Sequence, residues 1–388
     1  MGKEVLSMKK VGIMTFHASH NNGSMLQTLA LQSVLRNKYN FDAEVVNYSN
    51  EAQQNMYAVL SKATNYKKII KNMILATNLK QLKIQFNSYN EFINKYFKLS
   101  GKIISNREEF EKIKDKYDAF VAGSDQVWNV KAQDADDIYY LDFETKAPKL
   151  SYAVSFGANN PFLTNKKDKY AECIRNFNLL SVREHNAQKW IKAGTGIEPQ
   201  ICLDPTMLLS EEEWENTVNV GEPIIKGDYI FYYCFHITEE VQKFLNFVSK
   251  KYNMPVYFME AKEWTLKTCW KNKIKLIKSY GPDVYMNVVK NSKMFITTSF
   301  HGTAFATIYR KNFWYIDSGK NDPSKDDRAI SFLTQLNLMG RYKTIKDLKE
   351  MDLNEMPDYE DVYSRLDGLK EKSYGYLDKL SKVINDGK

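Results

Sequence analysis

The residues best suited to chemistry in this chain lie around His301. An apolar run that includes Phe295 and Ile296 ends in the hydroxyl residues 297–299, and a stretch with helical spacing begins at Thr303, directly after Gly302. This order predicts a strand, a tight turn and a helix start, where ligands of α/β sheets bind. A helix start attracts anions, and a histidine there can transfer protons near neutral pH. We predict a catalytic His301, the alternative being a structural histidine that bonds a loop carbonyl. The predicted anion-binding neighbours are Ser299, Gly302 and Thr303.

A second strand–loop–helix pattern begins the chain. Residues 10–16 are mainly apolar and predict a buried strand, residues 17–24 are mainly polar with one glycine, and residues 25–35 have helical spacing. With a further predicted strand at residues 41–48, this is a βαβ unit of the kind that binds nucleotides, although the loop matches neither GxGxxG nor the P-loop. The loop is a candidate anion site, with His17 and His20 as either ligands or surface residues. Its candidate ligands are His17, Asn22, Gly23 and Ser24.

Three further positions carry charged groups near predicted strand or helix ends. Arg183 follows a predicted strand, where a guanidinium can clamp a carboxylate or phosphate, the alternative being an ion pair with Glu184. Asp125 follows another predicted strand beside Ser124, so it can accept a proton or bind a sugar hydroxyl, or else cap a helix. Arg328 begins a late predicted helix and either meets a phosphate or forms a surface salt bridge. Together these residues predict a site assembled from several segments.

Composition restricts the class of partner. The chain has 388 residues with 43% hydrophobic content, which suits two globular domains rather than one core. The net charge of +8 suits anionic small substrates or an anionic membrane surface. The basic residues are spread out, so we expect solvated lysines and no nucleic-acid partner.

The cysteines and the hydropathy pattern exclude other classes of site. None of the four cysteines has CxxC spacing, so we expect buried thiols, no metal site and no cofactor. No signal peptide precedes Val11, and no apolar run reaches the length of a membrane span. We therefore expect a cytoplasmic protein.

The order of the predicted elements divides the chain into two α/β domains. We expect an N-terminal Rossmann-like domain at residues 1–215, interrupted by a basic, mainly helical insertion at about 55–115. This insertion is predicted as a solvated helical layer, with a lid or a membrane-facing surface as alternatives. A linker at 211–226 leads to a C-terminal Rossmann-like domain at 225–350. A helix at 355–388 is expected to pack back on the N-terminal domain, and the two domains should face each other across a cleft.

A set of short motifs, in order, resembles the polysaccharide pyruvyl transferase family along most of the chain. One such motif is weakly specific, but the ordered set is strongly so. The motifs are Thr-Phe-His at 15–17, Asn-Gly-Ser-Met-Leu-Gln at 22–27, Gly-Ser-Asp-Gln-Val-Trp-Asn at 123–129, Ser-Val-Arg-Glu at 181–184, Leu-Asp-Pro-Thr at 203–206, Gly-Pro at 281–282 and Thr-Ser-Phe-His-Gly at 298–302.

The resemblance implies a fold similar to GT-B glycosyltransferases, with two Rossmann-like domains around an active cleft. It also implies a reaction in which phosphoenolpyruvate donates its enolpyruvyl part to two sugar hydroxyls as a cyclic ketal. His301 would protonate C3 of the donor, and Arg183 would hold its carboxylate or phosphate. Asp125 is the leading candidate for the group that deprotonates the acceptor. Backbone N–H groups at residues 22–24 and 302–303 would receive the phosphate.

The chain also departs from the family pattern. Some members carry arginine where this chain has Ser299, an aromatic residue where it has Asn22, and aspartate where it has Thr298. With one donor-binding arginine missing, Arg328 or a lysine would have to substitute. We therefore keep three hypotheses. The first is a cytoplasmic pyruvyl transferase acting on a lipid-linked or nucleotide-linked saccharide of a bacterial surface polysaccharide. The second is a glycosyltransferase with a nucleotide-sugar donor, whose basic 55–115 region meets the membrane, and the third is a non-catalytic saccharide-binding or assembly protein. The sequence does not determine the oligomeric state.

Overall fold

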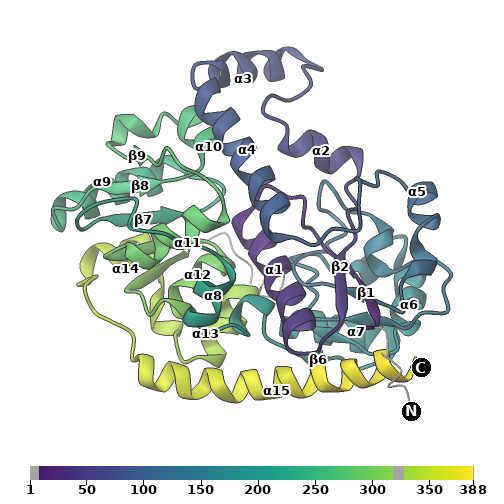
Figure 1. Cartoon of the computed structure of the whole chain (residues 1–388). Coiled ribbons are helices and arrows are strands. Elements are labelled where there is room, and N and C mark those ends of the chain that lie inside the picture. The colour runs from purple at the N-terminus through teal and green to yellow at the C-terminus, as the bar shows by residue number, and fades with distance from the viewer. Residues whose placement is uncertain (1–7, 318–326, 388) are drawn as a thin grey trace.

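The computed structural model describes residues 8–317 and 327–387 and contains two parallel sheets, each with helices around it (Figure 1). The first has the strand order β2-β1-β3-β4, and the second has the order β12-β11-β10-β7-β8-β9. A two-stranded parallel pair, β5-β6, lies beside the first sheet, to which bridges at Leu150–Leu179 and Val154–Val182 connect it. Parallel strands require crossover connections, which here are mostly helices.

The N-terminal domain is built on the first sheet, whose strands are buried on both faces. In β3, Ala119 and Val121 pack with α1, whereas Phe120 and Ala122 face the opposite core, because successive side chains of a strand point to opposite faces. The elements of this domain are β1 (Lys10–Met14), α1 (Asn22–Asn37), β2 (Asp42–Val45), β3 (Ala119–Ala122), β4 (Lys149–Ser151), α6 (Lys167–Arg175), β5 (Ser181–Val182), α7 (His185–Thr195) and β6 (Gln200–Ile201), with the 3-10 helices η2 (Asp137–Tyr140), η3 (Pro161–Leu163) and η4 (Pro205–Met207).

The C-terminal domain repeats this arrangement around the larger sheet. In β10, Phe295 faces the core shared with the N-terminal domain, while Met294 and Ile296 face a separate core. Its elements are β7 (Ile230–Tyr233), α9 (Glu239–Lys251), β8 (Val256–Phe258), α10 (Ala261–Leu266), η5 (Cys269–Asn272), β9 (Lys275–Leu276), α11 (Pro282–Asn291), β10 (Met294–Thr297), α12 (Phe300–Ile308), β11 (Phe313–Asp317), α13 (Arg328–Gln335), η6 (Met339–Arg341), β12 (Tyr342–Thr344) and α14 (Ile345–Glu350).

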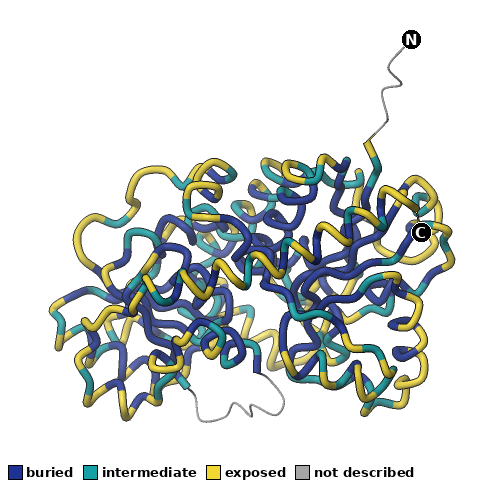
Figure 2. Tube along the Cα trace, turned by 90° about the horizontal axis from the view of Figure 1, so that it is seen from below, coloured by how far each residue is buried: buried dark blue, intermediate teal, exposed yellow. Residues whose placement is uncertain are grey.

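Helix α1 lies between the two sheets and joins the domains. It is buried on almost every side, because its residues pack against the first sheet on one side and against α11 on the other. Its buried polar residues are hydrogen-bonded within the fold, as when Gln32 donates to the carbonyl of Lys98 at 2.8 Å. Figure 2 shows a buried centre in each half of the molecule and buried segments between the halves. The two domains therefore share a core beneath the cleft, which fixes their relative position.

The segment between β2 and β3 forms a protruding helical insertion. Helices α3 and α4 rise from the N-terminal domain and pack against α10 of the C-terminal domain (Figure 1). Tyr89 and Phe92 of α4 belong to the core shared by both domains, so the insertion is anchored at its base. Its elements are α2 (Glu51–Tyr57), α3 (Tyr66–Ala76), α4 (Leu79–Tyr96), α5 (Arg107–Glu111) and η1 (Lys114–Lys116).

Two helices, α8 and α15, differ from what the sequence predicted for their segments. The segment 211–226, predicted as a linker, begins with α8 (Glu211–Thr217), which Ser210 caps and whose Trp214 is completely buried. The long helix α15 (Tyr359–Asp386) contacts both domains: Tyr376 donates to the carbonyl of Ser151 at 2.7 Å, and Tyr359 donates to the carbonyl of Lys311 at 2.6 Å. It therefore runs along both domains, as Figure 1 shows.

Candidate active site

A cavity of about 640 Å3 opens at the carboxyl ends of the C-terminal strands, where the two domains meet. The C-terminal sheet supplies one wall through Tyr232, Thr298 and Tyr315, and the N-terminal domain closes the other side with Asn21 and Asp125. Ligands of open α/β sheets bind at this edge. The charged and polar side chains of the lining also include Gln126, His236, Glu240, Ser299, His301, Asp317, Arg328 and Lys346.

His301 lies in the first turn of α12, on the border between the domains. Its side chain is 9% exposed, and its Nε2 lies 3.5 Å from Oδ2 of Asp204. The other edge of the ring packs on Gly23 at the start of α1, where a Cβ atom would come within 2.2 Å of Nδ1. Only glycine allows the two helix starts to approach this closely. The geometry leaves the Nε2 edge facing a buried carboxylate and places the ring at the wall of the cavity.

Asp204 and Arg183 form the buried charge pair behind His301. Nη1 of Arg183 donates to Oδ2 of Asp204 at 2.5 Å, and the guanidinium stacks on the Phe300 ring, 4.3 Å from its centre. Oδ1 of Asp204 accepts from the backbone N–H of Thr206 at 3.0 Å and from its hydroxyl at 2.8 Å. These bonds fix the carboxylate in one position. Asp204 is thus placed to orient the imidazole and to stabilise it when protonated.

Asp125 lies on the same side of the cleft and lines the cavity. Its backbone adopts a left-handed conformation, with φ of 64°, and its carboxylate accepts a hydrogen bond from the Ser24 hydroxyl. Nη2 of Arg183 lies 3.6 Å from its other oxygen. Ser24 therefore positions Asp125 rather than facing the cavity itself, since it is 2% exposed.

Burial and charge set the protonation of these acids. Burial by itself raises the pKa of Asp204, but His301, Arg183 and the N–H of Thr206 outweigh it and hold that pKa well below its usual range. The same balance, with His301 and Arg183 opposing burial, lowers the pKa of Asp125. Burial instead dominates at Glu184 and raises its pKa to about 7, despite the neighbouring Arg183. Asp125 and Asp204 are therefore carboxylates at neutral pH.

The start of α12 offers donors to an anion in the cavity. Within residues 8–317 and 327–387, no acceptor meets the backbone N–H groups of Phe300 and His301. Arg328 at the start of α13 and Lys346 in α14 bring positive charge to the same cavity, which Asp125, Glu240 and Asp317 also line. The free N–H groups of α12, with positive side chains beside them, favour a phosphate or carboxylate at this end of the cavity.

Four of the five backbone N–H groups that we predicted to receive a phosphate, at residues 22–24 and 302–303, have acceptors within the protein. The N–H groups of Gly23 and Ser24 donate to the Asn21 side chain at 2.9 and 3.2 Å. Those of Gly302 and Thr303 donate to the Ser299 hydroxyl and carbonyl at 3.3 and 3.0 Å. Helix caps occupy these donors, so the free donors at α12 are the two that precede Gly302.

Several residues predicted to bind substrate lie below the site instead. His17 is 1% exposed and bonds Oδ1 of Asn47 at 3.0 Å, and its burial lowers its pKa. Ser124 is completely buried, and its hydroxyl donates to the carbonyl of Ala153 at 2.7 Å. Gly302 packs directly on Thr297, and Thr303 is completely buried. These residues shape the turns without reaching the cavity.

Arg183 and Asn22 also differ from expectation. The Arg183 side chain is 3% exposed and does not line the cavity of about 640 Å3. It contacts the Asp204 and Asp125 carboxylates from the buried side of the site. Asn22 is fully buried, and its Nδ2 faces the sulfur of Met259 at 3.5 Å, across the domain boundary. In contrast, Ser299, His301, Asp125 and Arg328 line the cavity together.

Sequence reasoning missed two groups that the fold brings into the site. Asp204 belongs to the Leu-Asp-Pro-Thr motif, and an acid at a predicted strand end before Pro205 is a signal that can be recognised in the sequence. Lys346 lies in a plain surface-type sequence, Thr-Ile-Lys-Asp, with no local signal. Only the position of α14 beside β12 directs it to the cavity.

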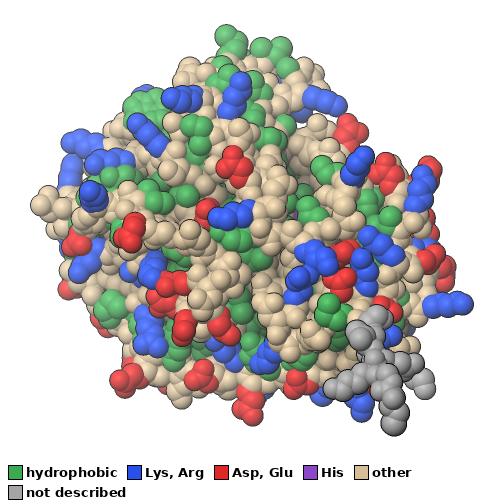
Figure 3. All heavy atoms as spheres, in the orientation of Figure 1, with side chains coloured by type: hydrophobic (Ala, Val, Ile, Leu, Met, Phe, Trp, Pro, Cys, Tyr) green, Lys and Arg blue, Asp and Glu red, His purple; other side chains and the backbone are tan. Residues whose placement is uncertain are grey.

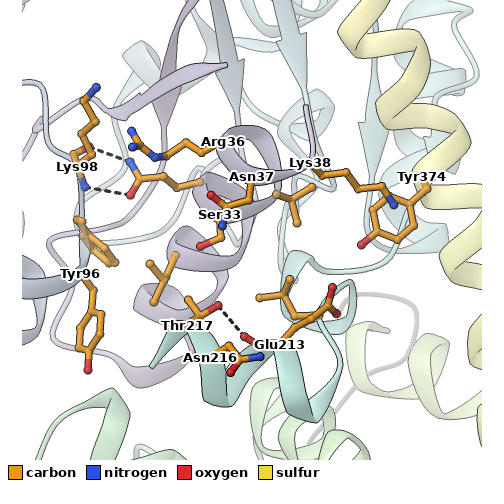
Figure 4. Close-up of a pocket in the computed structure, with 15 residues that line it drawn as sticks. Ser33, Arg36, Asn37, Lys38, Tyr96, Lys98, Glu213, Asn216, Thr217 and Tyr374 are labelled. Carbon is orange, nitrogen blue, oxygen red and sulfur yellow. Dashed lines mark hydrogen bonds between the residues drawn. The ribbon is translucent and has the colours of Figure 1, made fainter. Parts of the chain in front are cut away.

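A larger cavity, of about 930 Å3, lies on another part of the molecule (Figure 4). It is lined by the end of α1, the end of α4, α8 and Tyr374 of α15, and Lys38 sits over the Tyr374 ring at 3.2 Å. We refer to it as the α1–α8 groove. None of the residues discussed above as candidate site residues lines it. It therefore serves as an internal reference for the site at His301.

Two further properties concern metals and membranes. In the part of the chain that the structure describes, no three His, Cys, Asp or Glu side chains gather as a metal-binding group. Among the helices of the same residues, none has both the length and the apolar character needed to cross a membrane.

Comparison with known proteins identifies the family. The chain matches the family model of polysaccharide pyruvyl transferase over residues 21–320. A search of curated proteins returns no significant match. Among solved structures, the chain is similar to the S. aureus MnaA–UDP co-structure, with a TM-score of 0.51, 10% identity, and coverage of 92% of this chain and 91% of that chain.

Other solved structures are similar at lower scores. UDP-N-acetylglucosamine 2-epimerase from Rickettsia bellii gives a TM-score of 0.44 at 13% identity, covering 97% of this chain and 98% of that chain. O-GlcNAc transferase from Thermobaculum terrenum gives 0.49 at 10% identity, covering 98% and 68%. The predicted fold class, two Rossmann-like domains in a GT-B-like arrangement, is confirmed by the two parallel sheets and the MnaA likeness. With its ordered motifs and the family match over most of its length, this chain belongs to the polysaccharide pyruvyl transferase family of transferases.

Proposed function

We propose that the protein transfers the pyruvyl group of phosphoenolpyruvate to two hydroxyls of one saccharide, forming a cyclic ketal. In this reaction C3 of the donor gains a proton, two C2–O bonds to the saccharide form, and the bond from C2 to the phosphate oxygen breaks. One hydroxyl proton balances the proton used at C3, and the other leaves with the phosphate. Family membership supports this reaction. The observation that carries it is the His301–Asp204 pair beside the anion-binding start of α12.

His301 supplies the proton to C3. Its Nε2 lies 3.5 Å from Oδ2 of Asp204, and the residue lines the cavity in which the donor is proposed to bind. A charged imidazole beside Asp204 is a general acid whose conjugate base keeps the same orientation, so it can accept a proton back after each turnover. Asp204 acts as a positioning residue, because it contacts His301 rather than the donor.

The donor's phosphate and carboxylate are held by the C-terminal side of the cavity. The N–H groups of Phe300 and His301, with Arg328 and Lys346, supply the donors and the positive charge. Arg328 and Lys346 would thereby replace the arginine that some family members carry where this chain has Ser299. Arg183, which the resemblance assigned to the donor, acts through Asp204 instead.

Asp125 is the proposed base for the acceptor hydroxyl. It is ionised at neutral pH, lines the cavity and has its orientation fixed by Ser24. A fixed carboxylate can accept a hydroxyl proton as the oxygen attacks C2. The acceptor is proposed to be a lipid-linked or nucleotide-linked saccharide of a bacterial surface polysaccharide, modified in the cytoplasm without a cofactor.

Calorimetric titration with phosphoenolpyruvate tests this proposal. We expect saturable binding by the wild type and loss of most of it in Arg328→Met combined with Lys346→Met. The matched control is Lys38→Met in the α1–α8 groove, which should bind like the wild type. If phosphoenolpyruvate binds neither alone nor with candidate glycans, while a nucleotide sugar does bind, the protein is a glycosyltransferase. Binding of glycans alone would indicate the non-catalytic role.

A further inference from the structure

Helix α3 presents an apolar stripe that the fold does not use. Its large apolar residues follow the i, i+3, i+4, i+7, i+8 spacing that places side chains on one helix face. They are five of the fifteen exposed large apolar side chains in the described part of the chain, gathered on a helix of eleven residues. Scattered apolar residues need no explanation, but a gathered patch marks an interaction surface. The stripe consists of Tyr66, Ile69, Ile70, Met73 and Ile74.

The stripe points away from the contact that holds α3 in place. Leu75 projects from the other side of the helix, is 1% exposed, and packs in a small core with Leu82, Ala261 and Tyr280. That core joins α3 to α4 and to the C-terminal domain. Met73, in contrast, is 68% exposed. The apolar stripe is therefore surplus to the stability of the helix, and the helix itself is firmly seated.

The charged residues around the stripe are all basic. From residue 52 to residue 90 the sequence contains six lysines and no acidic residue. Lys67, Lys68 and Lys71 lie on α3 itself, and all three are exposed. Among the described residues, none of these three takes part in an ion pair within 4.0 Å. Figure 3 shows hydrophobic and basic side chains together over the protruding end where α3 lies.

We propose that the α3 stripe and its flanking lysines dock the protein on an anionic lipid surface. A helix with one apolar face and a basic flank lies in the plane of a membrane interface, with its apolar side chains among the lipid headgroups. Each basic residue near an anionic leaflet strengthens the attraction. The proposal rests on the surface of α3 alone and is independent of the proposed reaction.

Charge argues against a second copy of this chain as the occupant. A symmetric contact through the stripe would bring Lys67, Lys68 and Lys71 of one copy against the same residues of the other. Like charges at an interface oppose association. An anionic bilayer satisfies both the apolar stripe and the lysines at once.

Docking through α3 would also orient the catalytic cleft. Helix α4 continues from α3 for 18 residues, roughly 27 Å. Its Tyr89 stacks on His20, with ring centres 5.1 Å apart, in the loop that carries Asn21 of the cavity wall. A rigid helix thus connects the proposed lipid contact to the edge of the site.

Vesicle flotation of the full-length protein tests the docking surface. We expect the wild type to float with phosphatidylcholine–phosphatidylglycerol vesicles, to float much less with pure phosphatidylcholine, and to dissociate at high salt. Lys67→Gln with Lys68→Gln should weaken binding by roughly 25-fold, at about fivefold per charge. Ile70→Ser with Met73→Ser should weaken it about tenfold or more. The paired controls are Lys102→Gln with Lys131→Gln, and Leu163→Ser, an exposed leucine of the N-terminal domain.

Each result decides the proposal. Weakening in both α3 variants, with both controls like the wild type, supports it. Failure of the wild type to float, or equal loss in variants and controls, overturns it. Light scattering without lipid tests the alternative occupant, a second copy of this chain. If the wild type is a dimer and Ile70→Ser with Met73→Ser makes it a monomer, the stripe is a contact between copies and the lipid proposal is overturned. Circular dichroism should show all variants folded, since none of the substituted side chains is buried.

Discussion

The two sides of the cleft carry their charges in different ways. On the N-terminal side, Arg183 and the carboxylates of Asp125, Glu184 and Asp204 are buried and face one another. On the C-terminal side, charged side chains of both signs, Arg328, Lys346, Glu240 and Asp317, line an open cavity. Buried ions must be paired to offset their lost hydration, and the pairing fixes their geometry. Cations at a cavity wall stay partly hydrated and can exchange water for a ligand. The comparison indicates that one side positions groups and the other side binds substrate.

His301 belongs to both sides, because its helix comes from the C-terminal domain while its Nε2 faces Asp204 of the N-terminal domain. The α1–α8 groove offers the contrasting case of a larger cavity with no such buried network among its lining residues (Figure 4). Size therefore does not identify the site. The site is identified by the buried Asp204, the histidine that it faces and the cavity that this histidine lines.

The largest expected effect comes from removing the group that joins the two sides. His301→Gln should lower kcat by roughly 100- to 10,000-fold, the usual contribution of general acid catalysis, while phosphoenolpyruvate binding changes less than about threefold. Steady-state kinetics and calorimetry on the same sample measure both. A variant that keeps activity within about tenfold of the wild type would exclude His301 as the acid.

Unpairing the buried network should mainly cost stability. Asp204→Asn leaves the Arg183 guanidinium without its closest carboxylate and should lower the free energy of unfolding by about 3–5 kcal/mol. Replacing the pair together, with Arg183→Met and Asp204→Leu, should cost less, because the two closest opposite charges are removed together, while Asp125 and Glu184 lose only longer contacts of 3.6 and 3.7 Å. Urea unfolding compares the two. If the double variant has a lower free energy of unfolding than Asp204→Asn, the two residues stabilise the fold by more than neutralising each other's charge.

Changing a residue of the cavity lining on the C-terminal side should alter the binding of phosphoenolpyruvate rather than kcat. Lys346→Met should raise KM for phosphoenolpyruvate about tenfold, with kcat within about threefold, because a cation at the cavity wall binds the donor before and during the reaction. Lys38→Met in the α1–α8 groove is the matched control and should leave both constants unchanged. A fall in kcat with unchanged KM would place Lys346 with the positioning groups.

A further effect, confined to a range of pH, concerns stability. Burial raises the pKa of Glu184 from 4.5 to about 7, so the folded state holds a proton that the unfolded state has released. Below pH 4.5 the acid is protonated in both states, and this group does not alter the free energy of unfolding. As pH rises from 4.5 to about 7, the free energy of unfolding falls by at most roughly 3 kcal/mol, because only the unfolded state gains by releasing the proton. Glu184→Gln should remove this decline. Urea unfolding from pH 5 to pH 8 measures it, and an unchanged slope in the variant would contradict the assignment.

Local sequence patterns predicted the turns well but not the direction of each side chain within them. His301 and Ser299 follow a strand end, as their pattern indicated, and they line the cavity. Gly302 and Thr303 belong to the same turn but pack on β10 or on the helix interior. Which face of a helix start meets a cavity depends on what lies opposite, and a sequence window does not contain that partner.

The sequence by itself determined the alternation of strands and helices, the two-domain α/β class and the family, because periodic burial and turn chemistry are local properties. Only the tertiary structure decided that Arg183 is buried against Asp204, that Gly23 lies against the His301 ring, and that Lys346 reaches the cavity. These contacts join residues from different elements, and none of them can be predicted from adjacent positions in the sequence. Charge pairing and close packing act between surfaces that meet only when the domains assemble around α1, so their outcome follows from the fold rather than from any one segment.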